Sequence, residues 1–172
     1  GASANLLNCT IYGNVADSKT VGHGLTMSAG TAKNLILYAN GFGEAALTGG
    51  NLVRTGGTVS YSCVTPASDA NGTGNIEGNP YFADAANGDF HLLFGSTCRD
   101  SGETLAALTN DIAGVLRPQG SGYDMGCYEA VPFSEPECLF RVVSGAQGPA
   151  PLSTVFTTQV SLVTGIVSYT WT

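Results

Sequence analysis

A short segment near the start of the chain recurs at a fixed offset of 26 residues. The segment NCTIYGN begins at Asn8, and its counterpart NLILYAN begins at Asn34. Each copy has the length of a strand, alternates apolar with polar residues and ends at Gly or Asn. Repeat periods of about 20–50 residues in a sequence of strands and turns are typical of solenoids, in which each repeat packs on its neighbours.

The alternation within the repeat predicts which side chains face the interior. We expect three inward side chains in the first copy, namely Leu7, Cys9 and Ile11. We expect three outward ones, namely Asn8, Thr10 and Tyr12. One repeat later, Leu35 and Leu37 would stack on the inward residues, and Asn14 and Asn40 would form an amide ladder at the strand ends.

A third segment, TVSYSCV, begins at Thr58, about 24 residues after the second. Strands at near-equal offsets favour an all-β chain built as a right-handed parallel β-helix, with successive coils about 4.8 Å apart. An antiparallel sandwich is the alternative, although that fold would not require equal offsets.

Composition supports a turn-rich all-β fold and argues against several partners. Charged residues make up 11% of the chain, and it contains 24 Gly but no low-complexity tract. The net charge of −7 with six Lys and Arg argues against nucleic acid and anionic membranes, because both require basic patches. No apolar run has transmembrane length and no signal peptide opens the chain, so we expect no membrane insertion in this segment and interpret Gly1 as a mature or excised end.

The distribution of charge divides the chain. Eleven of the thirteen carboxylates lie between Asp69 and Glu137. We therefore expect β-helix coils over residues 1–66 and an acidic loop-rich C-terminal cap over 67–131, and the stretch VPFSEPE predicts a linker over 132–138.

An ordered series of motifs in residues 5–129 resembles a known family. The series runs from VSYSCV through GNIEGNPYF, DFHL and STCRDSG to DIAGVLRP and DMGCYE. It is similar to the C-terminal part of secreted bacterial β-helix proteins of the choice-of-anchor Q type. The resemblance implies a pectin-lyase-like β-helix and a location outside the cell or on its surface. Arg99 departs from the family, which usually has an apolar residue there.

The tail of the chain resembles a different module. The stretches GPAPLSTVFT and YTWT are similar to the first half of a PKD-type immunoglobulin-like module. This resemblance implies a partial β-sandwich segment over 139–172, since such modules normally continue past the Trp with further strands.

Five cysteines leave at least one thiol unpaired within the chain. Cys98 and Cys127 lie in the cap motifs STCRDSG and DMGCYE, and a crosslink would stabilise loops that lack regular ladders. We predict a Cys98–Cys127 disulfide, which the chain-entropy treatment values at about 3 kcal/mol. Cys9 and Cys63 are interpreted as small inward apolar residues, and Cys138 would be spare or compete for Cys127.

Two Asx-rich and Gly-rich loops offer hard oxygen ligands for calcium. The candidate ligands are Asp69, Asn71, Asn75, Asp84, Asn87 and Asp89. Neither loop has EF-hand spacing, and Asx and Gly residues also make tight turns without any metal. The structural interpretation is favoured, with Ca²⁺ as the alternative; no other cofactor is expected.

Outward-facing tyrosines are the candidate carbohydrate contact. Tyr12 and Tyr38 would stack on one face of the repeat, where aromatic rings suit sugar rings but also simply stabilise strand pairs. No catalytic residues are predicted. His23 is the only plausible base in the repeat region, and the few charged residues there do not recur at the repeat offset.

Taken together, these features favour a non-catalytic extracellular surface or matrix protein with a structural or adhesive role. Its partners would be polysaccharide or another cell-surface component. One alternative is a fragment of a carbohydrate-active β-helix enzyme, a polysaccharide lyase or glycosidase, whose active site lies upstream. The other is a self-assembling filament subunit, joined to copies of itself through an open coil edge and the incomplete sandwich.

Overall fold

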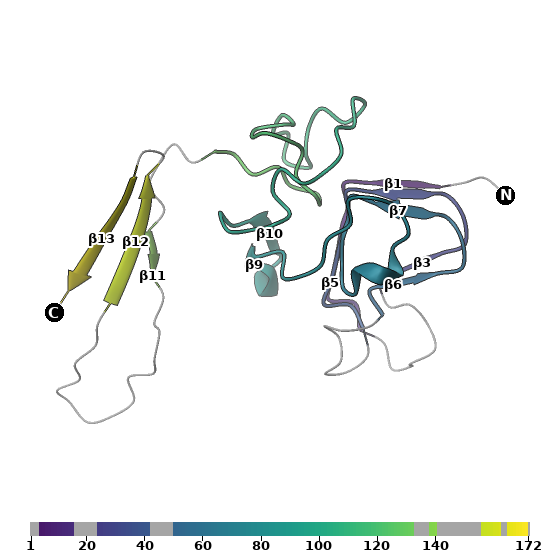
Figure 1. Cartoon of the computed structure of the whole chain (residues 1–172), viewed down its shortest axis with the longest axis horizontal. Helices are drawn as coiled ribbons and strands as arrows, with labels where there is room; N and C mark the ends of the chain where they lie inside the picture. The colour runs from purple at the N-terminus through teal and green to yellow at the C-terminus, as the bar shows by residue number, and fades with distance from the viewer. Residues whose placement is uncertain are drawn as a thin grey trace, which may run out of the picture. The chain divides into compact units, whose positions relative to one another are not determined.

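The structure is a computed structural model that describes residues 4–15, 24–41 and 50–132, together with the backbone of three later strands. The chain forms two compact units, Gly1–Val131 and Pro132–Thr172, and each is described by itself (Figure 1). Secondary structure in the described residues consists of short strands and two 3₁₀ turns, so the all-β prediction is confirmed.

The first unit begins with short strands in three successive circuits of the chain. The first circuit comprises β1 (Asn5–Leu7), β2 (Thr10–Tyr12) and β3 (Leu25–Met27). The second comprises β4 (Thr31–Lys33), β5 (Ile36–Tyr38) and β6 (Leu52–Arg54), and the third β7 (Thr58–Ser60) and β8 (Cys63–Val64). Corresponding strands stack into parallel sheets with the orders β1-β4-β7, β2-β5-β8 and β3-β6, and Figure 1 shows them lying on one another.

The strand register follows the sequence repeat. Tyr12 pairs with Tyr38 across β2 and β5, which confirms the 26-residue offset. Ile36 pairs with Cys63 across β5 and β8, so the next circuit is offset by 27 residues rather than about 24. Because every pairing among these strands is parallel, the antiparallel sandwich is wrong for this part of the chain.

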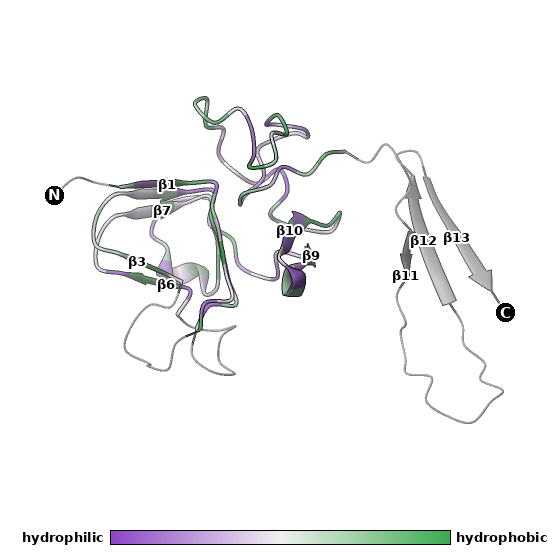
Figure 2. Cartoon of the chain, turned by 180° about the vertical axis from the view of Figure 1, so that it is seen from behind, coloured by the Kyte–Doolittle hydropathy of each residue, from purple (hydrophilic) through white to green (hydrophobic). Residues whose placement is uncertain are grey.

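The interior of the circuits is a column of apolar side chains. The buried members are Met27, Ala32, Leu35, Leu37, Leu52, Val59 and Val64. Cys9 and Ile11 pack against this core, as predicted, but Leu6 takes the place expected for Leu7. The reason is Asn8, whose positive φ of 48° makes a corner that interrupts the alternation of a strand. Apolar and polar residues intermingle along the circuits, as Figure 2 shows.

Asparagine side chains reinforce the circuits at their ends. The Nδ2 of Asn14 donates to Oδ1 of Asn40 over 2.9 Å, which confirms the predicted amide ladder. Asn40 Nδ2 in turn donates to Oδ1 of Asn51 over 3.1 Å, and Asn40 and Asn51 are fully buried. These bonds satisfy polar groups that would otherwise be costly inside the unit.

The cap follows the third circuit. It begins with the 3₁₀ turn η2 (Ala67–Asp69) and continues through β9 (Phe82–Asp84), η3 (Ala85–Asn87) and β10 (Asp89–Leu92). Strands β9 and β10 pair antiparallel, and loops continue to residue 132. The cap returns to the second circuit, where Asn34 Nδ2 donates to the Glu103 carbonyl and Asn34 Oδ1 accepts from the Glu103 N–H, both over 2.8 Å.

The second unit contains a three-stranded antiparallel sheet. Its strands are β11 (Cys138–Phe140), β12 (Phe156–Leu162) and β13 (Gly165–Trp171), in the order β11-β12-β13. Within the residues described in both units, no helix is long and apolar enough to cross a membrane.

Candidate binding cleft

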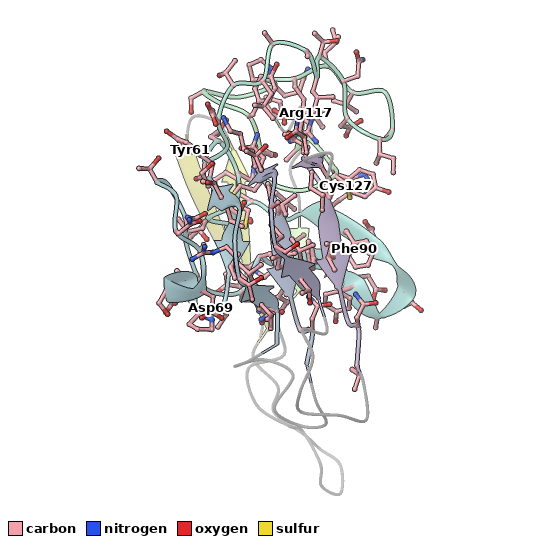
Figure 3. The ribbon with its side chains drawn as sticks, turned by 90° about the vertical axis from the view of Figure 1, so that its right-hand side faces the viewer. Tyr61, Asp69, Phe90, Arg117 and Cys127 are labelled. Atoms are coloured by element: carbon pink, nitrogen blue, oxygen red, sulfur yellow. The ribbon has the colours of Figure 1, made fainter. Side chains whose placement is uncertain are left out.

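A cleft of about 660 Å³ lies between the first circuit and the cap. Its first-circuit wall is residues 7–10, the corner between β1 and β2. The cap contributes Phe90, Asn110, Asp111, Ile112, Cys127 and Tyr128, among others. Figure 3 shows Phe90, Cys127 and Arg117 along one side of the unit, with Tyr61 and Asp69 on the other. The corner at Asn8 turns Leu7 outward into this cleft.

An aromatic cluster adjoins the cleft. Tyr12 stacks on Tyr38 with ring centroids 6.4 Å apart and an interplanar angle of 25°, as the strand register requires. Phe82 and Phe90 from the β9–β10 hairpin contact the Tyr12 ring at 5.8 and 5.3 Å. The predicted tyrosine pair is therefore half-buried under the hairpin, and burial raises the pKa of Tyr38. Phe90 belongs to this cluster and also lines the cleft.

A second aromatic surface comes from the end of the cap. The Tyr128 ring stacks on His91 with centroids 3.9 Å apart. His91 Nδ1 lies 2.6 Å from Asp89 Oδ1, and this hydrogen bond lowers the pKa of Asp89. His91 and Asp89 are largely exposed, so the pair orients the Tyr128 ring without forming a buried centre.

The carboxylate that lines the cleft is engaged in hydrogen bonds with the backbone. Asp111 Oδ1 accepts from the N–H groups of Ala113 and Val115, both over 2.8 Å. Its Oδ2 accepts from the Glu129 N–H over 2.9 Å. Asp111 therefore closes its own loop and joins it to the last segment of the cap, which leaves it poorly placed to transfer protons.

Arg117, at the base of the cleft, is likewise engaged in bonds to other groups of the protein. Arg117 Nη1 lies 2.8 Å from Glu129 Oε2, and each side chain is 1% exposed. Arg117 also donates to the carbonyls of Asp124 and Gly126 over 3.1 and 3.0 Å. Asp111 and Arg117 belong to the motif DIAGVLRP, and their partners Asp124, Gly126 and Glu129 belong to DMGCYE. The two motifs thus bind each other.

A buried acid completes this network. Asp124 accepts from the N–H groups of Asp100 and Ala130, both over 2.7 Å, and is 2% exposed. Burial raises its pKa to about 6, despite these two hydrogen bonds, which favour the charged form.

The predicted Cys98–Cys127 disulfide does not occur in the structure, where both thiols are free. The Cys127 N–H donates to Thr10 Oγ1 over 3.1 Å, whereas Cys98 lies with Cys63 in one buried cluster. Thr10 and Cys63 lie at opposite edges of the sheet β2-β5-β8. Two strand spacings, about 9–10 Å, therefore separate Thr10 from Cys63. Cys127 lies instead beside Cys9 in the cleft.

Four of the six predicted calcium ligands use their side-chain oxygens in local hydrogen bonds. Asn71 and Asn75 accept from the N–H groups of Val59 and Ser62, both over 3.1 Å. Asp84 caps η3 through the Asn87 N–H, Asp89 pairs with His91, and the Asp69 carbonyl accepts from Arg54. Across the described ranges, no group of three or more His, Cys, Asp or Glu side chains could hold a metal ion. Residue His23 and the Cys138 side chain lie outside the described residues.

Sequence reasoning missed the cap side of the cleft. Asn110, Ile112 and Tyr128 come from loops without periodicity and lie about a hundred positions from the corner that they face. The available signal was the corner itself, because Asn tolerates positive φ and recurs at positions 8 and 34. Comparisons with protein families, curated proteins and solved structures give no match for this chain.

Proposed function

We propose that the first unit is the C-terminal end of a right-handed parallel β-helix from an exported surface or matrix protein. Three stacked parallel circuits with an inward apolar column support this architecture. The motif resemblance to choice-of-anchor Q proteins supports export, and the antiparallel sheet of the second unit is compatible with a partial PKD-like module. On this basis the protein is extracellular and serves as a scaffold.

We further propose that the cleft binds polysaccharide without cleaving it. One observation carries this proposal. The cleft presents aromatic and amide side chains, whereas its charged side chains are already bound to other groups of the protein. Phe90 and Tyr128 supply half-buried rings beside exposed Asn110, and such surfaces suit the apolar faces and hydroxyl groups of sugars. Asp111 and Arg117, by contrast, already bind protein groups and do not present an acid and base pair.

Ile112 provides a direct test of this proposal because it lines the cleft and is 73% exposed. The substitution Ile112→Arg should obstruct the cleft and weaken oligosaccharide binding by about tenfold or more, which corresponds to about 1.4 kcal/mol. Leu116→Arg is the matched control, since Leu116 is 62% exposed in the same loop and does not line the cleft.

The assay is glycan-array binding followed by titration calorimetry with the best soluble oligosaccharide. Equal binding by both variants would refute the cleft as the site. Release of reducing or unsaturated ends by the unaltered protein would instead favour the carbohydrate-active-enzyme alternative.

Self-assembly is the second candidate function. In the part of the chain that the structure describes, β1, β2 and β3 are edge strands of their sheets. They lie on the same side of the stack, and edge strands of this kind recruit further strands. Sedimentation velocity over a hundredfold concentration range tests this candidate, and a constant monomeric sedimentation coefficient would exclude it.

A further inference from the structure

Cys63 and Cys98 lie inside the first unit, between the third circuit and the cap. Both are 0% exposed and belong to one buried cluster with Ile36, Leu92 and Met125. Interaction with Cys98 is the main cause of the lowered pKa of Cys63, and the Cys63 thiol also donates to the Gly78 carbonyl over 3.7 Å. Two buried thiols that share one apolar cluster are candidates for a disulfide.

The backbone on both sides of this pair is fixed. The Cys63 N–H donates to the Leu35 carbonyl over 2.8 Å, and Cys63 also forms a parallel bridge with Ile76. The Cys98 carbonyl accepts from the Met125 N–H over 3.0 Å.

Ser96 fixes the turn that carries Cys98. Its Oγ accepts from the Cys98 N–H over 3.1 Å and donates to the Pro80 carbonyl over 2.6 Å. The backbone on both sides of the pair is therefore held in place by hydrogen bonds.

We propose that Cys63 and Cys98 form the structural disulfide of this protein and tie β8 to the cap. The oxidant is a disulfide, supplied by glutathione disulfide or a thiol–disulfide oxidoreductase. One thiolate attacks the oxidant, forming a mixed disulfide and releasing one thiol. The second cysteine then attacks the mixed disulfide, so the S–S bond forms as a second thiol leaves. The two cysteines lose two electrons and two protons, and the oxidant gains both.

The two thiols differ in their electrostatics within the folded unit. The interaction with Cys98 lowers the pKa of Cys63, and the same interaction together with burial raises the pKa of Cys98. Because both sulfurs are shielded from solvent in the folded unit, the bond forms during folding, before the cap closes.

Peptide mapping can separate all five cysteines. Trypsin and Glu-C together cut the chain so that Cys63 lies in 55–77 and Cys98 in 78–99. The other three fall in 1–19, 104–129 and 138–141. The full-length chain is refolded in a glutathione redox buffer, alkylated and digested without reduction. We expect 55–77 linked to 78–99, with a mass two hydrogens below the sum of the separate peptides.

A thermal readout complements the map. Reducing the refolded protein should lower its Tm by roughly 10 °C, because the bond closes the loop from Cys63 to Cys98. This difference should vanish in the Cys63→Ala/Cys98→Ala variant and persist in the Cys9→Ala/Cys127→Ala variant. Alkylated Cys63 and Cys98 in the map would overturn the proposal, as would either cysteine linked to another peptide. The map of the unaltered chain decides this even where a variant fails to fold.

Discussion

Asn8 and Asn34 occupy the same corner in successive circuits, and Asn34 Nδ2 donates to Asn8 Oδ1 over 3.2 Å. Both have positive φ, 48° and 56°, a conformation that Asn tolerates better than most residues. The Asn34 amide also makes the two bonds to Glu103 that attach the cap. One buried amide therefore joins two circuits and the cap.

Two substitutions of Asn34 separate the contribution of its side-chain amide to stability from that of its backbone conformation. Asn34→Gly keeps the backbone conformation but removes the amide, which leaves buried groups unpaired at a cost of about 1–3 kcal/mol in unfolding free energy. Asn34→Ala should cost about 1 kcal/mol more, because Ala disfavours positive φ. Urea unfolding measures both. Equal stability of the Gly variant and the unaltered protein would show that the amide contributes nothing.

The buried pair Arg117 and Glu129 should be far more sensitive than the exposed pair Lys33 and Glu103. Glu129→Gln leaves the guanidinium buried without its counter-charge, and we expect a loss of about 3–5 kcal/mol. Lys33→Met removes an ion pair whose side chains are about one-third exposed, and we expect less than about 1 kcal/mol. Chemical denaturation of both variants at neutral pH checks the ranking, and similar losses would contradict it.

The sequence predicted the circuits better than the cap. The offset from Tyr12 to Tyr38 set the strand register because parallel stacking places equivalent residues side by side. The cap has no such period. Its loops are positioned by buried bonds such as Arg117 to Glu129, whose partners cannot be inferred from spacing. For the same reason the spacing of the cysteines could not show that Cys63 of β8 and Cys98 of the cap lie in one buried cluster, and the structure contains no Cys98–Cys127 disulfide.

Asp124 should give the first unit a distinctive pH dependence. Its pKa is about 6 in the folded chain, against 3.8 for an ordinary Asp. The folded state therefore binds a proton more tightly than the unfolded state. The stability contributed by Asp124 is fully present below pH about 4 and is lost as pH rises through about 6.

Asp124→Asn removes this titration while retaining a similar shape. The variant should be less stable than the unaltered protein at pH 4. The Asn side chain has only one oxygen, so its NH₂ group, a donor, must face the backbone N–H of Asp100 or Ala130, which is also a donor. The stability gap between the unaltered protein and the variant should then narrow as pH rises from 4 to 7. Urea unfolding in one-unit pH steps checks this. A stability gap that widens as pH rises would mean that folding lowers the pKa of Asp124 rather than raising it.

Gly126 and Gly114 form a matched pair for testing how closely the cap packs on the circuits. Both have strongly positive φ, 88° and 86°. A Cβ at Gly126 would lie 2.7 Å from Ile36 Cδ1 and from Thr10 Oγ1, whereas one at Gly114 would meet nothing within 4 Å. Ala at either site carries the backbone cost of about 1–2 kcal/mol, and only Gly126→Ala also disturbs the packing.

We therefore expect Gly126→Ala to lose about 1–3 kcal/mol more unfolding free energy than Gly114→Ala. Since Gly126 also donates its N–H to the Asn34 carbonyl over 2.8 Å, a displaced cap should weaken that bond too. Hydrogen exchange at the backbone amide of position 126 reports this second effect directly. Faster exchange there in Gly126→Ala, with Gly114→Ala unchanged, is expected because only the first substitution pushes the cap away from β5. Equal losses of stability in the two variants would mean that the cap does not pack on Ile36 as closely as described.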